Sequence, residues 1–497
     1  MTATRDVFLG LDVGTSGVKA LLLDAAGGDV VASATTALSL ATPQPGWAEQ
    51  HPDDWWKACL ASTRQVLERQ PEARVAAIGI SGQMHSSVFL DRAGAVVRPA
   101  LLWCDGRTTA ECQEITRRAG GESRLRDWVS NPALEGFTLP KVLWLRHHEP
   151  AAFARVATVL LPKDFVRFRL TGTLAAEPSD ASGTLMYDPA RRRWSREIME
   201  AVELPLSLLP DVGESCEVLG RVTPQAAALS GLAAGTSVVG GGADNACGAT
   251  GVGVLAPGDT VVSWGTSGTV LAPTAEPRVD PGLRAHTFCH VAPNTWYLMG
   301  VVLSAGAAFA WYRDQVAREG AGAGDERLTE EAAGVPAGAA GVTFLPYLQG
   351  ERTPHRDAAM RGAFLGLSLA HTRAHLTRAV LEGVAFALRD SLSILQELGL
   401  SPAVLLLTGG GARSPFIRRL LADVFGVPVT TVNREEGPAY GAALMAAVGA
   451  GAFADLAVAA TRTLTRAPLL STDPVACAEY QRLYARFRAG YPASRPP

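Results

Sequence analysis

The stretch Leu9-Gly-Leu-Asp-Val-Gly-Thr-Ser-Gly-Val-Lys19 decides the fold of this chain. An apolar run ends at Asp12, a turn of small residues follows, and a second apolar run begins at Val18. Short apolar runs bounded by turn residues predict buried strands. Gly14-Thr-Ser-Gly17 is therefore expected to join two strands in a hairpin.

This hairpin carries groups that suit a phosphate and a metal ion. Its glycines let backbone N–H groups approach phosphate oxygens closely, and Thr15 and Ser16 add hydroxyl donors. Lys19 adds a positive charge, and Asp12 offers the carboxylate oxygens that Mg²⁺ prefers. Taken alone, the stretch also fits an ordinary hairpin turn. It is neither a P-loop nor a dinucleotide fingerprint, because it lacks the Gly-Lys-Ser/Thr ending and a strand, not a helix, follows it.

A second copy of the tetrapeptide Gly-Thr-Ser-Gly occurs at residues 265–268, inside Val262-Ser-Trp-Gly-Thr-Ser-Gly-Thr-Val270. The flanking apolar runs again predict two strands. The repeat suggests that the two halves of the chain have similar architecture. A phosphate bound by both hairpins would lie in a cleft between two domains.

Two further loops follow strand-like runs, Gly240-Gly-Gly-Ala-Asp-Asn-Ala246 and Leu407-Thr-Gly-Gly-Gly-Ala-Arg-Ser414. The first belongs to an expected strand over 238–244 that ends on glycines, and Asp244 follows the three glycines. A kinase acting on a hydroxyl needs a carboxylate that orients the attacking oxygen and accepts its proton. Asp244 is our candidate for that base, although an aspartate there is also a common helix cap.

The chain has 497 residues, too many for one hydrophobic core, so two or three domains are expected. Alternating strand and helix patterns predict α/β domains with a boundary between Asn245 and Gly258. Helices are expected over residues 140–147, 163–170, 372–397 and 476–487. The Gly-, Ala- and Glu-rich segment 318–340 is expected to be a mobile surface excursion.

Composition excludes several classes of function. A net charge of −3 gives no general attraction to nucleic acid or to anionic membranes. Seven cysteines without a Cys-x-x-Cys spacing argue against a disulfide framework and a zinc site. The chain shows no signal peptide and no apolar run long enough to span a membrane, so we expect a cytoplasmic protein.

Together these segments resemble the FGGY-type carbohydrate kinases, over about residues 7–450. The resemblance implies an α/β fold of two actin-like ATPase (RNase-H-like) domains, with the active site in the cleft between them. It implies a sugar-binding domain over 1–245, a nucleotide-binding domain over 246–450 and a C-terminal packing segment over 451–497. ATP and Mg²⁺ would be required, and a homodimer is a family expectation.

The resemblance also implies roles for individual residues. Asp244 would be the proton acceptor, with Asn245 beside it on the sugar side, and Asp12 would serve the metal, through water. The residues expected to contact ATP phosphates or adenosine are Thr15, Ser16, Lys19, Thr266, Gly306, Gly409, Gly410, Gly411 and Ser414.

The segment Gly82-Gln-Met-His-Ser86 indicates the substrate. Glycerol kinases carry Arg-Glu here, whereas the xylulokinases of the family carry Gly-Gln-Met-His, as this chain does. Met84 and His85 are therefore expected to contact D-xylulose, although a lone histidine is often purely structural. Ser86-Ser87 and Cys104 depart from the usual xylulokinase pattern and leave the fine specificity open.

A second xylulokinase-like segment, Pro99 to Arg107, contains Trp103 and Asp105. Trp103 is expected to line the sugar pocket, and Asp105 either accepts hydrogen bonds from the sugar or supports its own loop. We therefore expect an ATP-dependent D-xylulose kinase. The alternatives are a kinase for ribulose, gluconate or arabinitol, and a non-catalytic actin-like nucleotide switch.

Overall fold

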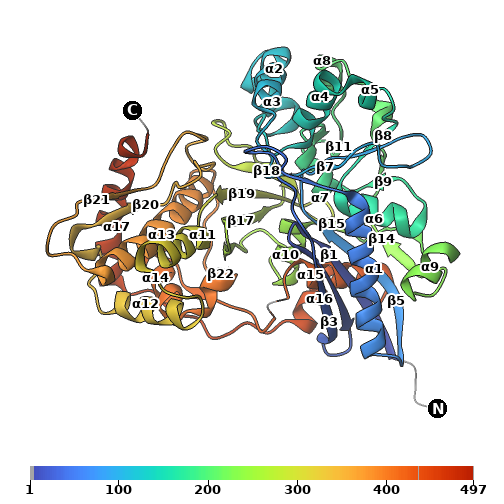
Figure 1. Ribbon diagram of the computed structural model, residues 1–497. Coiled ribbons are helices and arrows are strands. Elements are labelled where there is room, and N and C mark those ends of the chain that lie inside the picture. The colour runs from blue at the N-terminus through green and yellow to red at the C-terminus, as the bar shows by residue number, and fades with distance from the viewer. Residues whose placement is uncertain (1–4, 435, 496–497) are drawn as a thin grey trace.

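Two mixed sheets with the same pattern of strands organise the computed structural model, which describes residues 5–434 and 436–495 (Figure 1). In the first sheet, β1 (Arg5–Val13), β2 (Gly17–Asp24) and β3 (Asp29–Ala37) form an antiparallel meander, and β5 (Ala73–Gly82) lies parallel to β1. The hairpin predicted at 14–17 is confirmed, because β1 and β2 pair on either side of it.

The second sheet repeats this arrangement. Strands β16 (Val261–Trp264), β17 (Gly268–Thr274) and β19 (Trp296–Val302) form the meander, and β22 (Leu405–Thr408) lies parallel to β16. Strands β18 (His286–Cys289) and β23 (Val429–Thr430) complete its two edges. The two-domain α/β fold expected from the repeated tetrapeptide is thus confirmed.

Helices cover both sheets, and several of them lie where helices were expected. Helix α1 (Pro52–Arg69) packs on β2 and β3, and α13 (Arg373–Glu397) packs on β19 and β17. The predicted helices at 140–147 and 163–170 are confirmed as α4 (Thr138–His148) and α6 (Pro162–Thr171). Within the described residues, no helix is both long and apolar enough to cross a membrane.

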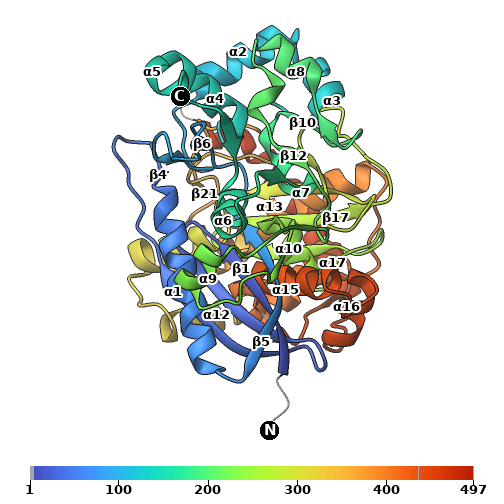
Figure 2. The same cartoon turned by 90° about the vertical axis from the view of Figure 1, so that its right-hand side faces the viewer.

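The division of the chain in space differs from the division at residue 245. Helix α15 (Pro438–Gly449) lies late in the sequence but packs on β1 and β5 of the first sheet (Figures 1 and 2). Glycines make this close approach possible: a Cβ on Gly10 would lie 2.0 Å from the Ala439 carbonyl oxygen, and one on Gly79 would lie 1.9 Å from that of Ala442. The second half of the chain therefore supplies part of the first lobe.

The two segments without an assigned role are both packed helices. The expectation of a mobile excursion at 318–340 is wrong, because α12 (Ala323–Ala333) packs on α13 and buries Leu328 and Ala332. In the tail, α16 (Leu456–Thr463) packs on α15, whereas α17 (Pro474–Ala489) packs on the second lobe. The packing helix predicted over 476–487 is confirmed.

Candidate active site between the two lobes

Two aspartates meet where neighbouring strands of the first sheet end. Strands β1 and β15 (Gly242–Ala243) both run parallel to β5, and Ser81 pairs with Asp12 on one side and with Gly242 on the other. The carboxyl ends of parallel strands share one edge of a sheet, which is where ligands bind in open α/β folds. Asp12 is the second-last residue of β1, and Asp244 directly follows β15.

The strand expected over 238–244 is in fact two short strands. β14 (Ser237–Val239) ends before Gly240, and β15 begins at Gly242. Gly241 between them has φ +78° and packs so tightly on β5 that a Cβ would lie 2.0 Å from the Ile80 carbonyl oxygen. This break redirects the chain, so that helix α10 (Asp244–Gly251) starts at the aspartate.

Asp244 does not act as the cap of that helix. Ala243 occupies the N-cap position, and Asp244 is the first helical residue. Its Oδ1 accepts hydrogen bonds from the backbone N of Asn245 at 2.7 Å and from Asn245 Nδ2 at 2.9 Å. Burial, with the nearby negative charge of Asp12, raises the pKa of Asp244 to about 7. A carboxyl with that pKa exchanges protons readily near neutral pH.

Asp12 has an oxygen available for a ligand. Its Oδ1 is buried and makes no hydrogen bond to any residue that the structure describes. Burial raises the pKa of Asp12 to about 6, against the opposing effects of Ser81 and Lys19. A divalent cation would satisfy this oxygen. No group of three or more potential metal ligands occurs among the described residues, so water and phosphate would have to complete the coordination of such an ion.

A cavity of about 360 Å³ lies between the lobes and is lined by Asp244 and Asn245 from the first lobe. Its other walls come from both lobes, including Gly248 and Pro438 on the first-lobe side and Ser263, Thr408 and Gly409 on the second. A larger cavity of about 1020 Å³ adjoins it. Of the residues predicted to bind nucleotide, five line this larger cavity: Thr266, Gly306, Gly410, Gly411 and Ser414.

The first hairpin is hydrogen-bonded to the loop that was predicted to bind the sugar. Thr15 Oγ1 donates to Gln83 Oε1 at 3.0 Å and accepts from Trp103 Nε1 at 2.9 Å. Ser16 is exposed at the hairpin tip. Lys19 Nζ lies 2.5 Å from Glu436 Oε2, so it forms an ion pair with the second half of the chain. Binding of ATP phosphates by these three side chains remains a prediction.

Of the predicted sugar residues, Met84 lies against Asn245, next to the aspartate in sequence, and His85 follows it in the same loop. Asn245 Nδ2 is 3.6 Å from Met84 Sδ. His85 Nδ1 lies 2.5 Å from the Gly183 carbonyl oxygen and must donate to it, because a carbonyl only accepts. Burial lowers the pKa of His85 to about 3, so the ring is neutral and Nε2 is its acceptor. The loop thus offers an acceptor nitrogen without adding a charge.

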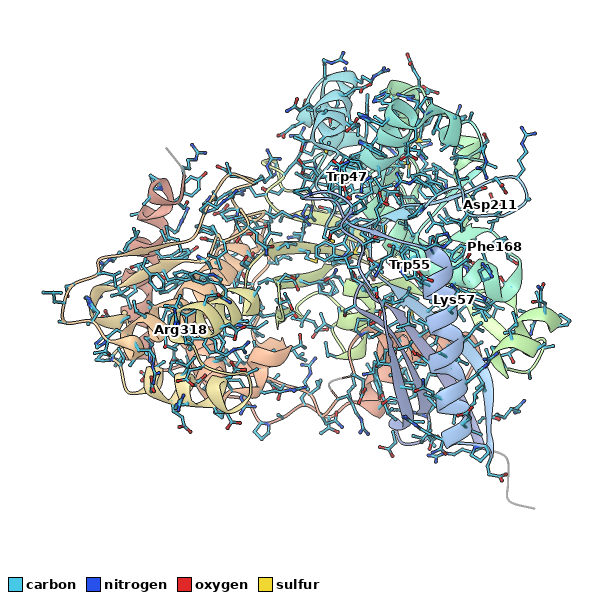
Figure 3. The ribbon with its side chains drawn as sticks, in the orientation of Figure 1. Trp47, Trp55, Lys57, Phe168, Asp211 and Arg318 are labelled. Atoms are coloured by element: carbon cyan, nitrogen blue, oxygen red, sulfur yellow. The ribbon has the colours of Figure 1, made fainter. Side chains whose placement is uncertain are left out.

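Of the two roles left open for Asp105, the structure supports the loop-forming one. Asp105 is 1% exposed, and Oδ2 accepts from the backbone N of Ala48 at 2.6 Å and from Arg107 Nη2 at 2.7 Å. The Arg107 guanidinium lies 3.5 Å from the ring centre of Trp47, which Figure 3 labels. Both oxygens of Asp105 are thus engaged by Arg107 and the neighbouring backbone, which favours the loop-forming role over the predicted sugar contact.

Sequence reasoning missed two residues of the site. Gln83 lies inside the segment 82–86, yet no role was predicted for it, and it links Thr15 to Gln50 through its side chain. Arg413 lies inside the glycine loop 407–414 and lines both cavities. Its position in a loop already expected to contact nucleotide was the only signal that pointed to it.

Comparisons with known proteins agree with this geometry. The N-terminal domain of the FGGY family of carbohydrate kinases matches residues 7–251, and its C-terminal domain matches residues 260–450. The xylulose kinase of Bacillus subtilis (strain 168) is 38% identical over 485 residues, which cover 97% of this chain and 96% of the relative.

Two solved structures have the same fold. The xylulose kinase from Rhodospirillum rubrum is 33% identical, with a TM-score of 0.91 and 98% of both chains covered. The gluconate kinase from Lactobacillus acidophilus is 26% identical, with a TM-score of 0.92 and 98% of both chains covered. Since the family matches extend over most of the sequence and Asp244 lines the cavity between the lobes, this chain belongs to the FGGY family of carbohydrate kinases.

Proposed function

We propose that the protein transfers the γ-phosphoryl group of ATP to the C5 hydroxyl of D-xylulose. The observation that carries the proposal is the contact between Asn245 and Met84, which brings the predicted base and the predicted sugar loop together. The naming of the Bacillus subtilis relative as a xylulose kinase supports the same substrate.

In this mechanism Asp244 is the general base. Its carboxylate orients the C5 hydroxyl and accepts the proton as the bond to phosphorus forms. Asn245 holds one oxygen of that carboxylate through two hydrogen bonds, so the other oxygen is the one that faces the substrate. With the carboxylate fixed in this way, the hydroxyl oxygen is aligned with the phosphorus before the reaction starts.

The nucleotide would extend from the cleft into the larger cavity beside Thr266, Gly306 and Ser414. Mg²⁺ would be held near Asp12, whose buried oxygen lacks a partner among the described residues. When bound, the ion would neutralise negative charge on the phosphates. Closure of the cleft would exclude water, which competes with the sugar for the phosphoryl group.

The side chains of Met84 and His85 carry no charge at neutral pH, which suits a ketopentose with several hydroxyls and no charge. We therefore expect D-xylulose to exceed D-ribulose, glycerol and gluconate in kcat/KM. His85→Ala should weaken sugar binding by about 1–3 kcal/mol, since a polar contact in a buried site is lost. Steady-state rates of wild type and variant on the four substrates provide the measurement.

A best rate on gluconate or glycerol would contradict the assignment to xylulose but not the assignment to a sugar kinase. ATP hydrolysis that no sugar accelerates would favour the nucleotide switch instead. Measuring ATP consumption with and without each sugar separates these cases.

The raised pKa of Asp244 predicts the pH dependence of the reaction. The base must be ionised to accept a proton, so kcat/KM should rise with pH, have its half-maximum at about pH 7 and then level off. Below that pH the neutral carboxyl is inactive. The profile should be recorded at saturating ATP and magnesium, and a flat profile from pH 5.5 to 8 would contradict the role of Asp244.

A further inference from the structure

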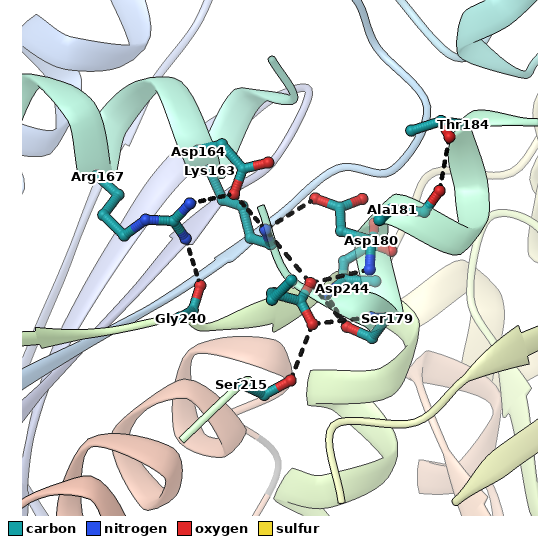
Figure 4. A network of polar contacts seen from close by, with 12 residues as sticks. Lys163, Asp164, Arg167, Ser179, Asp180, Ala181, Thr184, Ser215, Gly240 and Asp244 are labelled. Carbon is teal, nitrogen blue, oxygen red and sulfur yellow. Dashed lines mark hydrogen bonds and ion pairs between the residues drawn. The ribbon is translucent and has the colours of Figure 1, made fainter. Parts of the chain in front are cut away.

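Behind the proposed base lies a buried cluster of charged side chains that the reaction does not use directly (Figure 4). Lys163 Nζ lies 2.5 Å from Asp164, 3.3 Å from Glu177 and 3.4 Å from Asp180. Each of these four side chains is at most 1% exposed. Burying charges is costly unless ion pairs and hydrogen bonds compensate for the lost hydration.

Glu177 is the acceptor at the centre of the cluster. Its Oε1 accepts from Ser179 Oγ at 2.9 Å and from the backbone N of Asp180 at 2.8 Å. Its Oε2 accepts from the backbone N of Ser179 and from Ser215 Oγ, both at 2.8 Å. With Lys163 also beside it, Glu177 fixes the Ser179 hydroxyl in one orientation.

The Ser179 hydroxyl connects this cluster to the base. Because its hydrogen points to Glu177, its lone pairs are free to accept, and the backbone N of Ala243 donates to it at 2.9 Å. Ala243 is the N-cap residue directly before Asp244. Ala243 is the last residue of the loop 240–243. At the start of this loop, Arg167 Nη1 donates to the Gly240 carbonyl oxygen at 2.6 Å.

The backbone of the loop 240–243 has little room to move. A Cβ on Gly242 would lie 2.4 Å from Val291 Cγ1 and 3.3 Å from Ser179 Oγ, so the backbone already touches its neighbours. The hydrogen bond from Ala243 therefore sets where the first turn of α10 begins.

We infer that Ser179 is a positioning residue for the phosphoryl transfer: its hydroxyl, oriented by Glu177, fixes the backbone that places Asp244 against the sugar hydroxyl. This inference rests on the proposed role of Asp244 as the base. Ser179 does not touch the substrate itself and acts only through the backbone of Ala243.

Ser179→Ala tests the inference, and Ser215→Ala is its matched control. Both substitutions remove one buried hydroxyl from Glu177, but only the Ser179 hydroxyl also accepts from the loop before the base. Ser215 accepts from Gly241 through its backbone carbonyl, which the substitution keeps. We expect Ser179→Ala to lower kcat by about 10- to 100-fold, the loss that a misplacement of about 1 Å causes, while KM for D-xylulose changes less than about threefold. Ser215→Ala should keep kcat within about twofold of wild type.

Thermal unfolding of both variants shows whether they lose similar stability. If Ser179→Ala folds poorly, Ser179→Cys replaces it, because a thiol is a weak acceptor of similar size and should lower kcat in the same way. Normal kcat in the Ser179 variant, or equal losses of kcat in the Ser179 and Ser215 variants, would overturn the inference.

Asp244→Asn, measured in the same series, separates the two proposals. An inactive Asp244 variant beside a fully active Ser179 variant would refute the positioning role alone. An active Asp244 variant would refute the base, and the inference about Ser179 with it.

Discussion

Asp244→Asn is expected to lower kcat by about 10²–10⁴-fold, the usual contribution of a positioned general base. The amide has the size of the carboxylate but cannot accept the proton of the sugar hydroxyl. Oδ1 of Asp244 accepts two hydrogen bonds from Asn245, and the amide oxygen of the variant can keep them. The fold and the affinity for ATP should therefore be preserved.

Three measurements make this test specific. Circular dichroism and thermal unfolding confirm that the variant is folded, calorimetry with a non-hydrolysable ATP analogue confirms nucleotide binding, and steady-state rates give kcat. Turnover within a few-fold of wild type in a folded variant would show that Asp244 is not the base.

The second large effect is expected for Asp12→Ala. Removing the carboxylate should lower magnesium-dependent activity by on the order of 10²-fold, comparable to the loss of one electrostatic contact to the transition state. Binding of sugar without nucleotide should be nearly unchanged, because Asp12 is predicted to act through the metal. The measurement is calorimetric titration of D-xylulose into wild type and the Asp12→Ala variant. A loss of sugar affinity as large as the loss of activity would contradict the role of Asp12 at the metal.

The same variant should also move the pH profile. The negative charge of Asp12 contributes to the raised pKa of Asp244, so its removal should lower that pKa. The residual activity of Asp12→Ala should therefore persist to lower pH than that of wild type. Asp12→Asn should behave alike, since it also removes the charge.

The parts of the fold that local chemistry determines were predictable from the sequence. The hairpin at 14–17 follows from four small residues between two apolar runs, and its copy at 265–268 indicates the second sheet. Helix α13 follows from the spacing of its apolar residues. In each case the signal lies within the element itself.

The features that depend on distant residues were not predictable in this way. The hydrogen bond between Thr15 and Trp103 joins residues 88 positions apart. The role of Asp105 depends on the position of Arg107 over Trp47, which no local pattern encodes. Helix α12 was misread because its glycine- and alanine-rich flanks resemble a loop, whereas its burial against α13 comes from tertiary packing.

The return of α15 to the first sheet has a consequence for how the protein is made. The face of β1 and β5 that contains Gly10 and Gly79 is covered only when residues 438–449 have left the ribosome. Until then, nearly the whole chain has been synthesised while this apolar surface of the first lobe still lacks its cover. The first lobe therefore cannot complete its folding until residues 438–449 have been synthesised. The two lobes cannot fold one after the other in the order of translation.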